Sequence, residues 1–217
     1  MSTGHGGFLS YLLYALVYIA CLHVVYRRLG AGPLERRPHP AAVALCLVVA
    51  VPSLLQVPWP GIYDALSRQP SLIEHGQAWR LLTSVLVQDG GALGTAYNLV
   101  TLALTAAAAT ALWRPATAVA VFVAGALLFN LPATFLWRDA GGGNSGATFV
   151  LVTSTLAALV VRERVRSARA AVVVVAACGA ALLVLGDAHG EAVLAGLATG
   201  VLVATAVRRR SGPVGTR

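Results

Sequence analysis

The feature that most constrains this chain is a series of seven apolar blocks, each about as long as a lipid bilayer is thick. The blocks lie at residues 8–26, 41–57, 94–113, 116–137, 145–161, 171–186 and 189–207. A membrane-spanning helix needs about 20 mainly apolar residues, and 58% of the chain is hydrophobic while only 11% is charged. The sequence therefore predicts an all-α protein that crosses a membrane several times.

The basic residues are all arginine, and they lie almost entirely in alternate connections between the blocks. With the N-terminus outside, 13 of the 16 arginines fall on the cytoplasmic side, as the positive-inside rule requires. These are Arg27, Arg28, Arg36, Arg37, Arg114, Arg162, Arg164, Arg166, Arg169, Arg208, Arg209, Arg210 and Arg217. Topology thus explains the net charge of +8, and we expect no nucleic-acid partner. The C-terminus is predicted to be cytoplasmic.

The first block is predicted to be a retained helix. A signal peptide carries its positive charge before the apolar region, whereas here Arg27 and Arg28 follow it. The abundance of alanine, valine, glycine and arginine is typical of a GC-rich bacterium, so we expect a multi-pass protein of a bacterial plasma membrane. The three cysteines have no metal-ligand spacing, and we expect neither a metal nor another cofactor.

Three polar residues occupy a similar depth in three separate blocks. Ser145 lies 17 positions before Arg162, His189 lies 19 before Arg208, and Asn98 lies 16 before Arg114. At ~1.5 Å per helical residue these separations are about 24–29 Å, in a hydrocarbon core ~30 Å thick. All three residues are therefore predicted to lie just below the outer surface. Polar groups at such a depth are candidates for function.

His189 begins the last block, and small residues follow it on one helical face. Ala192, Gly196 and Gly200 lie 3, 7 and 11 positions downstream, which allows a second helix to approach closely. If that helix begins at Ser145, the imidazole can accept the serine proton and activate a nucleophile that is weak alone. The alternative is an interfacial histidine that caps a helix.

The residues around Ser145 suit a catalytic site. Gly143 gives a flexible approach, Gly146 would let a substrate backbone come close, and the unpaired N–H groups at a helix start suit a developing oxyanion. Phe149 lies one turn further on the same face, where its ring could support His189. Each feature also has a simpler explanation, because a GxSG sequence arises by chance in a glycine-rich chain and Phe149 could be core.

These motifs together resemble the rhomboid family of intramembrane serine proteases. The matching segments are GQAWRLLTS at 76–84, Asn98, GNSGATF at 143–149 and AHGEAVLAGLATG at 188–200. The resemblance implies that Ser145 is the nucleophile and His189 the base, with no acidic third member, and that Phe149 supports His189. It also implies that Trp79 and Arg80 seat an outer loop in the membrane, and that Asn98 helps to hold the oxyanion. The implied partners are a transmembrane protein substrate and membrane lipid.

The resemblance covers about residues 40–207 as a six-helix core. Residues 1–39 would then add one N-terminal transmembrane helix and a cytoplasmic linker, and residues 208–217 would form a basic cytoplasmic tail. The fold expected is therefore a six-helix rhomboid-like core plus one N-terminal transmembrane helix.

The sequence departs from the family pattern at two points, which keep other interpretations open. Gly94 stands where rhomboids commonly carry an oxyanion histidine, one turn before Asn98. The phrase LAGLATG can also be shifted by four residues, which places Val193 at the histidine position. An inactive rhomboid-fold protein that binds membrane segments is one alternative. A small transporter, suggested by Asn98, Asn130 and threonines within the blocks, is another.

Overall fold

The computed structural model describes residues 7–30, 32, 35, 37–163 and 166–210, and all its elements are helices. Their bounds are α1 Phe8–Leu29, α2 Pro40–Leu55, α3 Gly61–Leu66, α4 Pro70–Glu74, α5 Arg80–Thr83, the 3₁₀ helix η1 Ser84–Leu86, α6 Gly91–Leu112, α7 Pro115–Phe135, α8 Ser145–Glu163, α9 Arg166–Val184 and α10 His189–Arg210. Arg36, Arg164 and most of the predicted tail, residues 211–217, lie outside the described residues.

The seven long helices correspond to the seven apolar blocks, within a few residues at each end. Six of them are long and apolar enough to cross a membrane. The remaining one, α2, has 16 residues, which is shorter than the roughly 20 residues of an ideal span. The prediction of an all-α, multi-pass membrane protein is confirmed, and a seventh crossing by α2 stays a prediction.

Local sequence signals set several helix ends. Gly30 ends α1 in the left-handed conformation, with φ of 67°, where glycine has no steric cost. The side chain of His39 accepts a hydrogen bond from the Ala41 N–H at the start of α2, and Pro40 follows it at the first helical position. Pro115 starts α7 in the same way.

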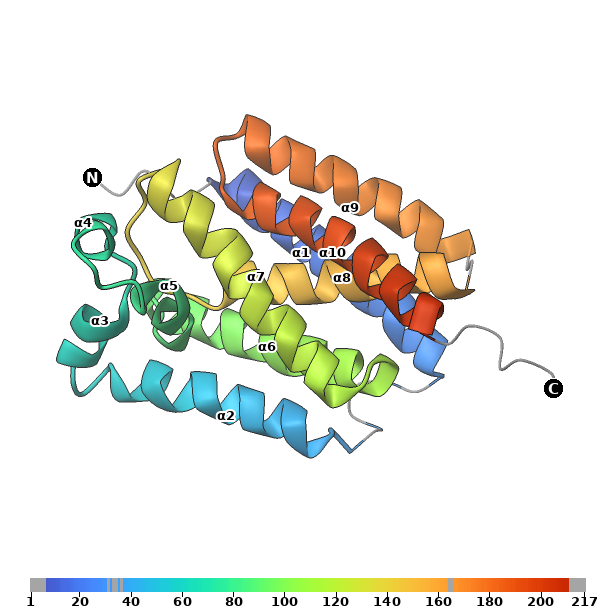
Figure 1. Ribbon diagram of the computed structural model, residues 1–217, viewed down its shortest axis with the longest axis horizontal. Helices are drawn as coiled ribbons and strands as arrows, with labels where there is room; N and C mark the ends of the chain where they lie inside the picture. The colour runs from blue at the N-terminus through green and yellow to red at the C-terminus, as the bar shows by residue number, and fades with distance from the viewer. Residues whose placement is uncertain (1–6, 31, 33–34, 36, 164–165, 211–217) are drawn as a thin grey trace.

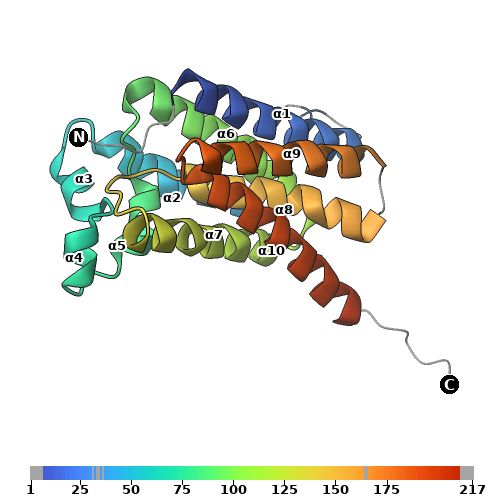
Figure 2. The same cartoon turned by 90° about the horizontal axis from the view of Figure 1, so that it is seen from above.

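Helix α8 forms the centre of the bundle. In its most apolar window 78% of the residues are buried, against 33–50% in the other five candidate spans. It contacts α1, α6, α7, α9 and α10, and two views at right angles show it surrounded by these helices (Figures 1 and 2). Its first residue, Ser145, is therefore carried on the element that the rest of the fold holds most firmly.

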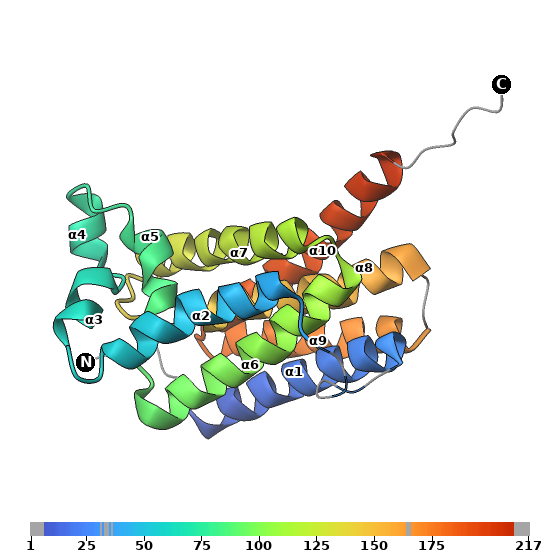
Figure 3. The ribbon, with the colours of Figure 1, turned by 90° about the horizontal axis from the view of Figure 1, so that it is seen from below.

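The long segment between α2 and α6, which is predicted to lie outside, is folded into short helices. Helices α3, α4 and α5 gather at one end of the bundle, beside the start of α8 (Figures 1 and 3). The sequence predicted a loop here, because each of these helices has only four to six residues, too few for a clear period.

We expect this end of the bundle to face outside the cell. Ser71, in α4, and Ser167, at the start of α9, are both exposed and lie on opposite sides of the predicted topology. In a background without native cysteines, an impermeant thiol reagent on intact cells should label Ser71→Cys and leave Ser167→Cys unlabelled until the cells are opened. The reverse pattern would invert the orientation inferred from the arginines.

Candidate active site

Ser145 and His189 meet at the starts of two adjacent helices. The Oγ atom of Ser145 lies 2.9 Å from Nε2 of His189, a hydrogen-bond distance. Both residues are half-buried, and α8 and α10 contact each other along much of their length. The pair that the sequence predicted from matching depth and from the small residues after His189 is therefore in contact.

The small-residue face of α10 is what brings these helix starts together. A Cβ atom added at Gly196 would lie 2.7 Å from the carbonyl oxygen of Val150, and one added at Gly200 would lie 2.7 Å from the Cα of Ser154. The hydroxyl of Thr153 also donates a hydrogen bond, of 3.2 Å, to the carbonyl of Val193 on α10. Glycine is thus needed at both positions for the backbones to approach this closely.

Aromatic rings surround the imidazole of His189. Its centroid lies 5.7 Å from the ring of Phe149, which is buried, and 5.0 Å from the ring of Phe129 on α7. Gly146 faces Phe129, since an added Cβ would lie only 2.7 Å from the Phe129 Cβ. The sequence predicts that Gly146 makes room for a substrate, whereas in the structure it makes room for the Phe129 ring. Phe149 is placed as the sequence suggested.

The other nitrogen of His189 faces an acidic residue that the sequence analysis missed. Nδ1 lies 2.8 Å from Oδ1 of Asp187, and 2.9 Å from the hydroxyl of Tyr14 on α1. Burial alone raises the pKa of Asp187, but the hydrogen bonds and charge of His189, with a hydrogen bond from Tyr14, outweigh this and lower it to about 2. The signal for Asp187 was its position two residues before the histidine. No local pattern indicated Tyr14, because its place depends on how α1 docks.

Asn98 and Ser145 both lie near Gly143. A Cβ added at Gly143 would be 3.6 Å from the Ser145 Oγ and 3.7 Å from the Asn98 Nδ2. The same Nδ2 donates a 2.8 Å hydrogen bond to Oε1 of Gln88, which orients the amide. Ser145 and Asn98 are therefore both near Gly143, and the oxyanion role of Asn98 stays a prediction.

Gln88 connects this amide to a buried polar network that the sequence did not indicate. Its Nε2 donates to Oδ1 of Asn144, at 2.9 Å, and to Oγ of Ser53, at 3.1 Å. Asn144 in turn donates through Nδ2 to the Asn98 carbonyl, at 3.2 Å. Buried polar groups that satisfy one another fix a single arrangement, so the residues on either side of Ser145 are held in place. Gly94, one turn before Asn98, has open space where a side chain would begin.

Arg68, for which the sequence indicated no role, joins the segment before α6 to the connection between α7 and α8. It is buried, and its guanidinium contacts Asn130 and the carboxylate of Asp139. The backbones of Arg68 and Gly141 also exchange hydrogen bonds of 2.7 and 2.9 Å. This clamp holds the approach to Ser145 against α7.

Arg80 connects the short helices of the segment before α6 to one another. Its buried guanidinium donates 2.8 Å hydrogen bonds to the carbonyls of Asp64 and Ser67, and a 2.7 Å bond to Oε1 of Gln77. Trp79 is 54% exposed, and its contact with lipid stays a prediction. Neither side chain contacts Ser145 or His189 through a hydrogen bond described in the structure.

We therefore expect Arg80→Ala to lower stability without removing the chemistry. The change leaves two carbonyls without their donor, which should cost about 2–3 kcal/mol. Thermal unfolding in detergent should show a clear decrease in midpoint, while the folded fraction should still react with a serine-directed probe at within about threefold of the wild-type rate. Complete loss of labelling in folded protein would give Arg80 a chemical role.

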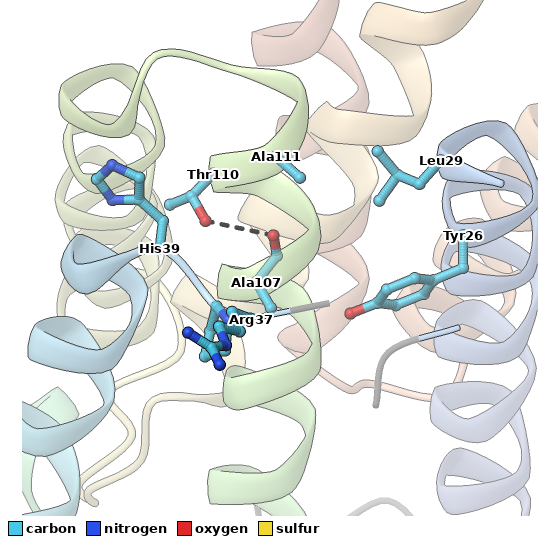
Figure 4. Close-up of a pocket in the computed structure, with 8 residues that line it drawn as sticks. Tyr26, Leu29, Arg37, His39, Ala107, Thr110 and Ala111 are labelled. Carbon is cyan, nitrogen blue, oxygen red and sulfur yellow. Dashed lines mark hydrogen bonds between the residues drawn. The ribbon is translucent and has the colours of Figure 1, made fainter. Parts of the chain in front are cut away.

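A separate cavity lies at the opposite end of the bundle. It has a volume of about 340 Å³ and is lined by residues of α1, α6 and the start of α2, including Tyr26, Arg37 and Thr110 (Figure 4). None of the residues around Ser145 lines it, so it is separate from the candidate site. Among the described residues, no cluster of three or more His, Cys, Asp or Glu could hold a metal ion.

No family model matches the chain, and a search of the curated proteins returns no similar sequence. The function must therefore be argued from the chemistry of the site itself.

Proposed function

We propose that this protein is a serine endopeptidase that cleaves transmembrane segments near the outer face of the membrane. The observation that carries the proposal is the 2.9 Å contact between Ser145 Oγ and His189 Nε2. The resemblance to rhomboid intramembrane proteases supports the same reaction. In this proposal the cell membrane holds both enzyme and substrate, and the C-terminus is cytoplasmic.

The geometry suits acyl transfer. Ser145 Oγ attacks the scissile carbonyl carbon while His189 Nε2 takes the hydroxyl proton, and His189 then gives that proton to the leaving amine. Water hydrolyses the resulting ester by the same route. The oxyanion would be stabilised by the Asn98 amide and by N–H groups in the first turn of α8. The Nδ2 atom of Asn98 lies near Gly143, as Ser145 Oγ does, and is oriented by Gln88.

The contacts favour His189 over the alternative register. Val193 is fully buried, and its carbonyl is bonded to Thr153 in the interface between α8 and α10. A residue in that position serves helix association, whereas His189 is the one that contacts the serine. The Gly94 position still lacks a histidine donor, which is the observation that favours a non-proteolytic protein of this fold.

The polar residues that suggested a transporter have structural partners. Asn130 donates to the Leu81 carbonyl at 2.8 Å and accepts from Arg68. Threonines within the spans, such as Thr110 and Thr134, bond to carbonyls of their own helices. These contacts weaken the reason for proposing a solute pathway.

The proposal can be tested in liposomes with a panel of fluorescent single-span segments. Wild-type protein should cut at least one of them near its outer end, and Ser145→Ala should cut none. If no segment is cut above the Ser145→Ala background, the non-proteolytic interpretation becomes the better one. Solute flux through the same liposomes that is equal in both proteins and above empty vesicles would instead favour transport.

A further inference from the structure

The side of His189 that faces away from Ser145 is enclosed by Asp187. This carboxylate is 2% exposed. Its Oδ1 accepts from the His189 backbone N–H, at 3.0 Å, and lies 2.8 Å from the ring Nδ1. Its Oδ2 accepts a hydrogen bond from the Tyr14 hydroxyl. Within the described part of the chain, the hydrogen bonds of this carboxylate therefore go to His189 and to Tyr14, which contacts His189.

The short connection between α9 and α10 holds Asp187 in this position. Gly186 has a left-handed φ of 74°, and the N–H of Asp187 donates to the Leu182 carbonyl at 2.9 Å. With the backbone turned in this way, the Asp187 side chain both caps the start of α10 and contacts the imidazole of His189. Residues so constrained lose little entropy when they orient a neighbour.

The contacts define which ring nitrogen carries the proton. The pKa of Asp187 is lowered to about 2, so at neutral pH this carboxylate can only accept. The Tyr14 hydroxyl has a single proton, which it uses in the hydrogen bond to Oδ2 of Asp187, so it has none to donate to Nδ1. Nδ1 of His189 must therefore be the donor toward Asp187, and Nε2 keeps its lone pair toward Ser145. This tautomer is the one that a general base requires.

The N-terminal helix supplies part of this arrangement. The Tyr14 ring lies 4.9 Å from His189 and 5.3 Å from Phe149 between ring centroids. Tyr18, one turn further along α1, stacks on Phe149 at 4.6 Å. Both tyrosines are buried, and α1 contacts α8 and α9. Helix α1 therefore contributes side chains that contact residues of the candidate site.

We propose that Asp187, clamped by Tyr14 from α1, is a positioning residue that fixes His189 with its proton on Nδ1, so that Ser145, His189 and Asp187 act as a triad. The inference rests on the proposed function for its catalytic meaning, but the tautomer can be measured without any substrate. Asp187 and Tyr14 act only through His189. Family resemblance implied a dyad alone.

The first test is nitrogen NMR of purified protein labelled with ¹⁵N-histidine in detergent. The His189 signals are assigned by their disappearance in His189→Gln. At neutral pH wild type should show a protonated Nδ1 and an unprotonated Nε2. Asp187→Asn should show a mixture or the reverse tautomer, because its amide N–H₂ can face Nδ1 as a donor. A wild-type ring protonated on Nε2, or an unchanged Nδ1–H form in Asp187→Asn, would overturn the proposal.

The second test is the rate at which a fluorophosphonate labels Ser145. Asp187→Asn should lower the rate by about 10³- to 10⁴-fold, as loss of the corresponding carboxylate does in other serine proteases, and Asp187→Glu should recover part of it. Tyr14→Phe keeps the ring and removes the hydroxyl that contacts Asp187 and Nδ1 of His189, so it should lower the rate roughly tenfold.

Matched controls separate positioning from general damage. Glu191→Gln neutralises an acid in the first turn of α10 that accepts a hydrogen bond from Trp137. Tyr11→Phe removes the hydroxyl of an exposed tyrosine on α1. Both should label at within about threefold of wild type. Labelling of Asp187→Asn at the wild-type rate would overturn the proposal. If that variant does not fold, labelling of Tyr14→Phe at the wild-type rate would overturn it. If wild type takes no label, the proposed function fails, while the tautomer measurement still tests Asp187.

Discussion

Replacing His189 by alanine should lower the rate of fluorophosphonate labelling at Ser145 by about 10⁴-fold or more, because an unassisted serine hydroxyl is a poor nucleophile. The Oγ atom would lose the base that lies 2.9 Å away. The fold should survive, since α10 keeps its close contacts with α8 at Gly196 and Gly200, two and three turns after His189. The rate is measured by following adduct formation on purified protein over time.

Val193→Ala is the matched control for this experiment. Val193 lies one turn after His189 on the same helix and is fully buried, so the change truncates the same α10 face without removing a base. It should cost stability, roughly 1–3 kcal/mol, while the folded fraction is labelled at nearly the wild-type rate. If Val193→Ala lost labelling and His189→Ala kept it, the choice of His189 as base would be wrong.

Replacing Gly196 by alanine should destabilise the protein by about 2–3 kcal/mol, because a single methyl group has no space between α8 and α10. The added Cβ would meet Thr153 and lie 2.7 Å from the Val150 carbonyl oxygen. Those atoms belong to the most buried helix of the bundle, so they cannot move aside cheaply. The free energy of unfolding can be measured by adding SDS to protein in mixed micelles.

Gly94→Ala makes the same chemical change in another long helix and serves as the comparison. An added Cβ there meets nothing within 4 Å, so the intrinsic preference of helices for alanine should stabilise the protein by up to about 1 kcal/mol. The two variants should thus have effects of opposite sign. A Gly196→Ala protein as stable as wild type would show that close approach of the two helices does not depend on this glycine.

Much of the fold follows from local patterns that act over a few residues. Apolar blocks of bilayer length located the long helices, and the depth of Ser145 and His189 below the surface placed the two residues at one level. The spacing of Gly196 and Gly200 predicted which face of α10 would be approached. Each of these inferences needs only the helical period and the thickness of a membrane.

The rest of the site depends on tertiary contacts that no local pattern encodes. Tyr14 reaches His189 only because α1 docks on α8 and α9. Gln88 and Arg68 lie in a segment without clear periodicity, and their partners come from α2, α7 and the loop before α8. Asp187 did carry a signal, since it lies two residues before the candidate base. The family resemblance, which implies no acidic member, drew attention away from it.

The most direct test of the central claim is mass spectrometry of the purified protein after treatment with a fluorophosphonate. We expect one adduct, located on the peptide that contains Ser145, and no adduct in Ser145→Ala. An active serine protease treated in parallel confirms that the reagent works under the same conditions. A wild-type protein that stays unmodified while the reference enzyme is labelled, or an adduct on another residue, would contradict Ser145 as the nucleophile.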